Sequence, residues 1–175
     1  DRFSSVNINT SFQRSARIDN KISKDFLDNF VFHDTSKKVL NQISSSLLNS
    51  NQSGFTLTGP YGTGKSSLAL FLKALIAKDS SIKKQAEKIA NFNNKHLFSR
   101  VFLNKKKWFT LNVIGSKNDP IESIAEQIDL TIKDQWISKG IPAPLKTKTK
   151  KTVAGVIKSL NNLIKELNKK GHGLI

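Results

Sequence analysis

The sequence predicts an α/β fold, in which short buried strands alternate with longer helices. Three short apolar segments, 54–58, 108–114 and 172–175, have the composition of buried strands. Between them, apolar residues recur at the three- and four-residue spacing that is typical of helices. This alternation is characteristic of a parallel sheet covered by helices, and we therefore expect a three-layer α/β core.

The first three predicted helices lie in the N-terminal half of the chain. Thr35 or Ser36 is expected to cap a helix that continues to about residue 48. A second helix is expected over 65–78, because apolar residues recur along one face of that segment. Asp79 begins a third helix, which runs to about residue 94.

Two further helices are predicted in the C-terminal half. Asp119, Pro120 and Glu122 have the types expected for an N-cap, a first helical residue and a capping box, and Gly140 ends this helix. Segment 141–151 contains two prolines and alternating lysines, which predicts a solvated linker without a core. A strongly amphipathic helix then follows from Val153 and ends at Gly171.

Residues 59–66 match the pattern G-x-x-x-x-G-K-[ST] without a substitution. Glycines at three of these positions let backbone N–H groups turn towards an anion. The lysine can reach the β- and γ-phosphates of a nucleotide, and the serine hydroxyl can bind Mg²⁺. We predict an ATP site with Lys65 as the catalytic residue and Ser66 as the metal ligand. Its cofactor-binding residues are Gly59, Pro60, Tyr61, Gly62, Thr63, Gly64, Lys65, Ser66 and Ser67.

The local sequence Phe-Thr-Leu-Thr-Gly-Pro-Tyr-Gly-Thr-Gly-Lys-Ser-Ser-Leu-Ala over 55–69 resembles the P-loop NTPases, and in particular the AAA and additional-strand ATPases. The resemblance covers the middle third of the chain. It is similar to the N-terminal part of large bacterial ATP-binding proteins of DNA processing or phage defence. It implies a three-layer P-loop NTPase core that binds ATP with Mg²⁺ and transmits hydrolysis to attached domains.

The resemblance also suggests a place for the adenine. In such ATPases the stretch before the helix that precedes the loop often lies against the base, and Phe32 and His33 occupy that place. The alternative is that Phe32 belongs to the core and His33 to the surface.

Residues His172–Ile175 are expected to begin a further strand. In P-loop ATPases a strand in this position ends in acidic residues that complete the magnesium shell and orient water. No strand predicted in this sequence ends in Asp-Glu, since Asp129 and Asp134 fall in a helical pattern and Asp79 is a cap. We therefore expect a core that is incomplete at the C-terminus, in a piece of a longer ATP hydrolase. The alternative is a nucleotide-binding protein without catalysis.

The domain organisation expected from these patterns is an N-terminal arm over 1–34, followed by an ATPase domain over 35–175. The arm contains a weak strand pattern at Val6 and Ile8, together with Arg14 and Arg17. The absence of methionine, even at position 1, is consistent with a piece of a longer chain.

The chain is strongly basic, with 29 Lys+Arg against 13 Asp+Glu and a formal net charge of +16. Such a charge suggests a polyanionic partner. The lysine-rich loops 105–107 and 146–151 are the candidate DNA contacts. The alternative is a solvated lysine surface without a partner, since the four arginines are few for a nucleic-acid reader.

The composition also excludes several classes of protein. The sequence has no cysteine, which excludes disulfides and thiolate metal sites. It contains no apolar run of transmembrane length and no signal-peptide pattern. Together these features predict a cytoplasmic protein.

Three other functions stay open. A GTPase would read guanine through Ser116-Lys117-Asn118-Asp119, although the first residue departs from the [NT]-K-x-D motif. A small-molecule kinase would need arginines in a lid, and beyond the loop the chain offers Arg100 alone. A lysine-rich nucleic-acid-binding or scaffold module with a vestigial loop would bind nucleotide without help from Lys65.

Overall fold

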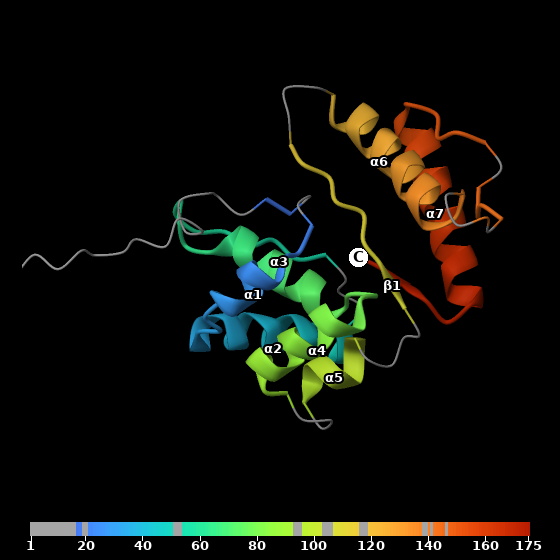
Figure 1. Cartoon of the computed structure of the whole chain (residues 1–175). Coiled ribbons are helices and arrows are strands. Elements are labelled where there is room, and N and C mark those ends of the chain that lie inside the picture. Colours follow the sequence, from blue (N-terminus) through green and yellow to red (C-terminus); the bar gives the residue numbers. More distant parts are fainter. Residues whose placement is uncertain are drawn as a thin grey trace, which may run out of the picture. The chain divides into compact units, whose positions relative to one another are not determined.

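The computed structural model describes residues 17–18, 21–50, 54–92, 96–102, 107–115, 119–137, 140, 142–145 and 147–175. These ranges contain seven helices and two short strands (Figure 1). The chain divides into two compact units, Asp1–Val101 and Phe102–Ile175. No helix in the described ranges is both long and apolar enough to cross a membrane.

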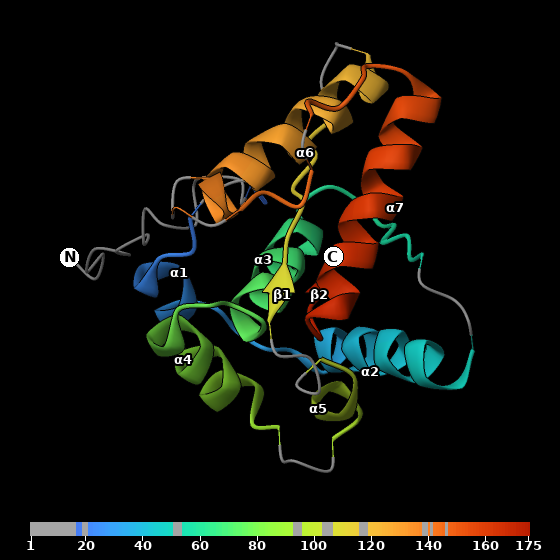
Figure 2. The same ribbon diagram turned by 90° about the vertical axis from the view of Figure 1, so that its right-hand side faces the viewer.

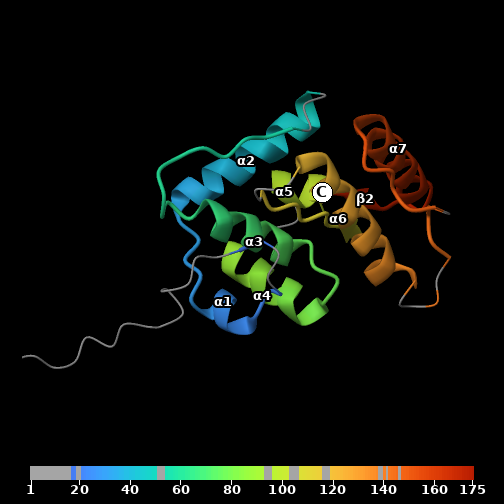
Figure 3. The same cartoon turned by 90° about the horizontal axis from the view of Figure 1, so that it is seen from above.

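The first unit is built from helices. They are α1 (Lys24–Asp28), α2 (Asp34–Asn49), α3 (Lys65–Leu75), α4 (Ser80–Ala90) and α5 (Leu97–Phe102), whose last residue belongs to the second unit. Helices α3 and α4 lie side by side, and α1 packs against α4 (Figure 3). Helix α1 lies within the segment predicted as an N-terminal arm, and that domain boundary stays a prediction. The strand pattern at Val6 and Ile8 lies outside the described residues.

An aromatic cluster forms the core of the first unit. Phe71 of α3 is fully buried and stacks on Phe30 with ring centroids 4.3 Å apart. Phe32 lies 4.9 Å from Phe71 and meets Phe92 edge-on at 5.8 Å. Aromatic pairs at these distances favour the folded state beyond the effect of burial alone. The cluster therefore holds α3 against the segment that precedes α2.

Helix caps follow the sequence prediction at two sites. The Asp79 carboxylate accepts hydrogen bonds from the backbone N–H groups of Ser81 and Ile82, at 2.8 and 3.3 Å. The Asp119 carboxylate accepts one from the N–H of Ile121 at 2.7 Å. Both therefore satisfy donors that the first turn of a helix leaves unpaired.

Two predicted cap details are wrong. Helix α2 begins one residue before Thr35, with His33 at the N-cap position and no side-chain cap bond, so Thr35 and Ser36 are helical residues. Glu122 does not complete a capping box, because its carboxylate lies towards Lys151, at 4.0 Å from Nζ.

The second unit contains β1 (Trp108–Phe109), α6 (Pro120–Gln135), α7 (Val153–Lys169) and β2 (Gly173–Leu174) (Figure 2). The two strands pair in parallel, with Trp108 opposite Gly173 and Phe109 opposite Leu174. The Ile175 N–H donates to the Phe109 carbonyl at 2.9 Å, and the Leu111 N–H donates to the Ile175 carbonyl at 2.8 Å. Since parallel strands need a crossover, the chain returns to the sheet through α6 and α7.

The core of the second unit lies among α6, α7 and the strands. Phe109 stacks on Trp136 with ring centroids 4.7 Å apart. Ile128 of α6 and Leu163 of α7 are fully buried. The other buried members of this core are Ala125, Ile132, Val156 and Leu167.

The predicted three-layer α/β core is wrong, because the described residues are mostly helical and their strands form one two-stranded parallel sheet. Residues 54–58 are not a strand, and they are exposed. Segment 108–114 contributes a strand of two residues, and 172–175 contributes the other. The physical reason is that a strand needs a neighbour to bond with its backbone, and apolar composition does not supply one.

Gly173 provides a test of the sheet. A Cβ at this position would overlap the Trp108 ring, and that ring is held by a 2.6 Å bond from its Nε1 to the Phe102 carbonyl. We expect Gly173→Ala to lower the free energy of unfolding of the second unit by about 1–3 kcal/mol, through overpacking. Urea titration followed by tryptophan fluorescence measures this, because the two tryptophans, Trp108 and Trp136, are both in this unit.

The matched control is Gly115→Ala, where a Cβ would meet no atom within 4 Å. This variant should unfold like the parent. Equal midpoints for Gly173→Ala and the parent would contradict the close approach of Trp108 to β2.

Asp79 provides a pH test of α4. The hydrogen bonds from Ser81 and Ile82 lower the pKa of Asp79 below its ordinary value of 3.8. A lowered pKa stabilises the fold above pH 3.8, and this contribution disappears as the pH falls through the lowered value. Asp79→Ala should therefore be less stable than the parent near neutral pH, and the difference should vanish in acid.

Urea titrations at several pH values, followed by circular dichroism at the helical band, check this expectation. Asp134→Ala removes an exposed carboxylate without a hydrogen bond to a described residue. It should not produce the same pattern, and a difference for Asp79→Ala that is independent of pH would argue against the cap.

Candidate phosphate-binding site

The backbone of loop 59–64 adopts a conformation at two positions that favours glycine. Gly62 and Gly64 both have a φ of 81°, in the left-handed region that side chains disfavour. A Cβ at either position would meet nothing within 4 Å, so conformation rather than crowding favours glycine there. Gly64 is the N-cap residue of α3, and the loop therefore leads directly into the helix.

The N–H groups of this loop have no acceptor among the residues that the structure describes. The backbone N–H groups of residues 61–67 donate to no described residue, and the first bond of the helix runs from the Leu68 N–H to the Gly64 carbonyl at 2.8 Å. The loop is exposed from Gly59 to Gly64. Free N–H groups at a helix N-terminus form a binding site for anions, which the helix dipole reinforces.

Lys65 bridges the two ends of the loop. Its Nζ donates to the Gly59 carbonyl at 2.9 Å and to the Pro60 carbonyl at 2.6 Å. It also lies 3.3 Å from Thr63 Oγ1, and the Thr63 hydroxyl donates to the Pro60 carbonyl at 2.9 Å. The ammonium group is thus beside the loop, within reach of any anion that the loop N–H groups bind.

The residues at the loop fit Mg²⁺ bound together with a phosphate. Ser66 is exposed, and its hydroxyl has no bond to a described residue. The described part of the chain holds no cluster of three or more His, Cys, Asp or Glu that could bind a metal alone. Mg²⁺ keeps several waters and binds substrate phosphates, and the hydroxyl of the last residue of the G-x-x-x-x-G-K-[ST] pattern, here Ser66, can supply a further ligand. Ser67 is half-buried and Tyr61 is 94% exposed.

The residues proposed near the adenine have different environments. Phe32 belongs to the aromatic cluster, and its ring packs against Phe71. His33 is exposed at the start of α2. Core packing accounts for Phe32 without a ligand, and contact of either residue with adenine stays a prediction.

The lysine-rich loops are described in part. Lys105, Lys106 and Lys146 lie outside the described residues, while Lys107, Lys148 and Lys150 are exposed. Arg100, which bears on the kinase alternative, is exposed on α5. Residues 116–118 of the guanine-like motif are also outside the described ranges, and the Asp119 carboxylate caps α6.

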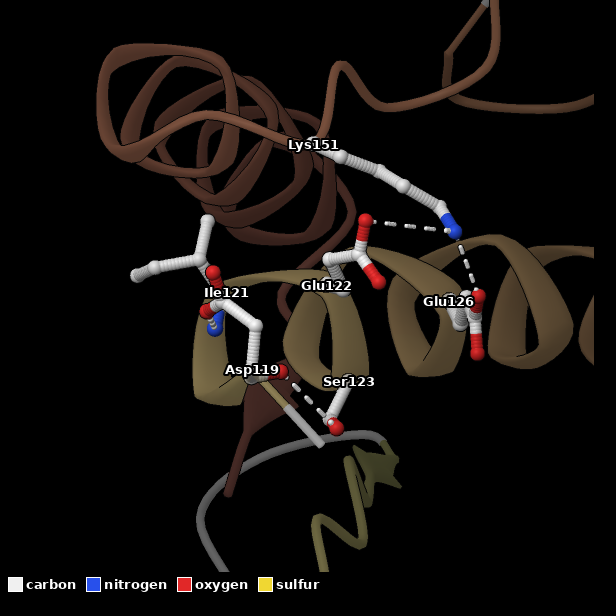
Figure 4. Close-up of polar contacts among 6 residues, drawn as sticks. All are labelled: Asp119, Ile121, Glu122, Ser123, Glu126 and Lys151. Atoms are coloured by element: carbon white, nitrogen blue, oxygen red, sulfur yellow. Dashed lines mark hydrogen bonds and ion pairs between the residues drawn. The ribbon is translucent and has the colours of Figure 1, made fainter. Parts of the chain in front are cut away.

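The prediction of a solvated linker at 141–151 is wrong in part, because α6 bonds to Thr149 and Lys151, whereas Lys148 and Lys150 are exposed. Figure 4 shows the contacts of Lys151. Lys151 Nζ lies 2.7 Å from a carboxylate oxygen of Glu126 and 4.0 Å from one of Glu122. The hydrogen bond with Glu126 raises the pKa of Lys151. The Thr149 N–H donates to the Asp129 carboxylate at 3.0 Å.

Apolar contacts complete this attachment. Ala143 and Leu145 pack against the core of the second unit, and Thr149 is buried. The sequence held a signal for it, because three of the four acidic residues of α6 recur at helical spacing, at 122, 126 and 129. A row of carboxylates along one helix face attracts a basic segment, and Lys151 is consequently less available to an external anion.

Comparison of the chain with family models, curated proteins and solved structures found no match. The resemblance to P-loop NTPases therefore depends on the sequence of residues 55–69 alone.

Proposed function

We propose that this chain binds Mg-ATP through residues 59–66. The observation that carries the proposal is the set of unpaired N–H groups over 61–67 at the N-terminus of α3, with the Lys65 ammonium beside them. Backbone N–H groups, a lysine and a hydroxyl are the three kinds of group that bind the phosphates and metal of a nucleotide.

Each residue has a separate role in this proposal. The loop N–H groups bind phosphate oxygens, and Lys65 exchanges its contacts with the Gly59 and Pro60 carbonyls for contacts with the phosphates. The Ser66 hydroxyl binds Mg²⁺, which supplies charge neutralisation when it is bound. We further propose that the chain acts within a larger cytoplasmic ATPase, because Mg-ATP is abundant in the cytoplasm, with carboxylates from elsewhere completing hydrolysis.

The loop lysine provides the direct test. Lys65→Ala should weaken ATP binding at least tenfold, about 1.4 kcal/mol, because it removes the charge beside the bound phosphates. Calorimetric titration with Mg-ATP measures the change. Lys84→Ala removes an exposed lysine from α4 of the same unit and should leave the affinity unchanged.

The metal contribution is tested separately. In Ser66→Ala, ATP affinity should become nearly the same in Mg²⁺ and in chelator, whereas the parent should bind better with Mg²⁺. Equal affinity for the parent and a folded Lys65→Ala variant would refute the site and favour the scaffold alternative. Preference for GTP in the same titration would favour the GTPase alternative.

A further inference from the structure

Helix α7 has one face that packs in the core and an opposite face that is exposed. Val156, Leu163 and Leu167 are the buried residues of this helix. Six exposed polar positions on the opposite side recur at helical spacing, so they form one stripe. The stripe consists of Lys158, Asn161, Asn162, Lys165, Asn168 and Lys169, all of them exposed.

Positive charge predominates along this stripe. Lys158 and Lys165 form no ion pair with a described residue, and neither does Lys170 at the C-cap. Glu166 is the acidic residue of α7, and it bonds to Lys169 at 2.7 Å. This hydrogen bond lowers the pKa of Glu166, so the pair is already neutralised. Lys158 and Lys165 therefore present their ammonium groups to solvent without an ion-pair partner among the described residues.

Three exposed asparagines accompany the lysines in the stripe. Asparagine is a weak helix former, yet Asn161, Asn162 and Asn168 lie inside α7. None of their side chains bonds to a described residue. Each amide offers two donors and one acceptor, which suit phosphate oxygens and the edges of bases.

We propose that this Lys/Asn stripe of α7 binds duplex DNA. It extends over about 17 Å of helix at 1.5 Å per residue, which is the length of about five base-pair steps. An α-helix fits the major groove of B-DNA, where lysines can reach phosphates and asparagines can reach adenine. The major groove of an RNA duplex is too deep and narrow for such a helix, so DNA is the better partner.

An anionic membrane is the competing partner, because an exposed apolar stripe adjoins the basic one. Val153, Ile157 and Ile164 are 58%, 53% and 41% exposed. Interfacial helices insert a broad apolar face, usually with Trp, Phe or Leu. In α7 the broad apolar face is already buried in the core, and the remaining stripe is narrow and β-branched. Asparagine amides also add little to attraction by lipid headgroups.

The proposal places DNA on α7 rather than on the lysine loops, and a charge-matched pair of variants separates the two. One variant is Lys158→Gln with Lys165→Gln. The other is Lys148→Gln with Lys150→Gln, which removes the same charge from exposed positions in the same unit. Both are measured by fluorescence anisotropy on a labelled DNA duplex over a range of salt concentrations, with the whole chain.

The α7 variant should bind more weakly, and its slope of log K against log salt should flatten by about 1.8, or 0.9 for each lost phosphate contact. The loop variant should keep the slope of the parent. Asn161→Ala with Asn162→Ala should weaken binding and leave the slope unchanged, because it removes no charge. Circular dichroism and tryptophan fluorescence confirm that each variant is folded.

Three results would overturn the proposal. The first is no binding of the parent to DNA at low salt. The second is equal flattening by the α7 and loop variants, which would indicate a diffuse effect of net charge. The third is binding to vesicles that contain phosphatidylserine but not to DNA. Lys65→Ala should bind DNA like the parent, so failure of the ATP site and failure of this proposal can be distinguished.

Discussion

Phe71 is fully buried in the first unit, and its ring contacts those of Phe30 at 4.3 Å and Phe32 at 4.9 Å. Full burial of a phenylalanine stabilises a fold by about 1.5–3 kcal/mol, and each aromatic pair adds about 0.5–1.5 kcal/mol. Phe71 belongs to α3, as Lys65 does, so its packing holds that helix against Phe30 and Phe32. The phosphate-binding loop is exposed from Gly59 to Gly64 and takes its position from that helix.

The second unit contains two short parallel strands, and a two-stranded sheet is not stable without further packing. Their stability comes from α6 and α7, whose side chains Ile128 and Leu163 are fully buried. The chain between these helices is then held by Asp129, which accepts the Thr149 N–H, and by Glu126, which binds Lys151. The acidic face of α6 thus compensates Lys151, whereas Lys158 and Lys165 of α7 form no ion pair with a described residue.

The sequence predicted helices and caps better than strands, for a physical reason. A helix bonds within its own segment, so Asp79 and Asp119 could be recognised as caps from local residue types. A strand depends on a partner that is distant in sequence. Segment 54–58 has an apolar composition, but its backbone forms no strand pairing with the described residues. The loop could be predicted from the spacing of its glycines, lysine and serine. The attachment of Thr149 and Lys151 could not, because it depends on contacts with residues of α6 that lie 20 and 25 positions earlier in the sequence.

Phosphate binding by Lys65 requires the loss of the hydrogen bonds that this residue already makes. Its ammonium already has two carbonyl partners and a hydroxyl, at 2.6–3.3 Å. A bound phosphate gains a charge-assisted partner, but the Gly59 and Pro60 carbonyls lose theirs. The net gain in free energy is therefore a difference between two sets of hydrogen bonds. Because these carbonyls are exposed, water can replace the lysine at little cost, and the exchange favours the phosphate.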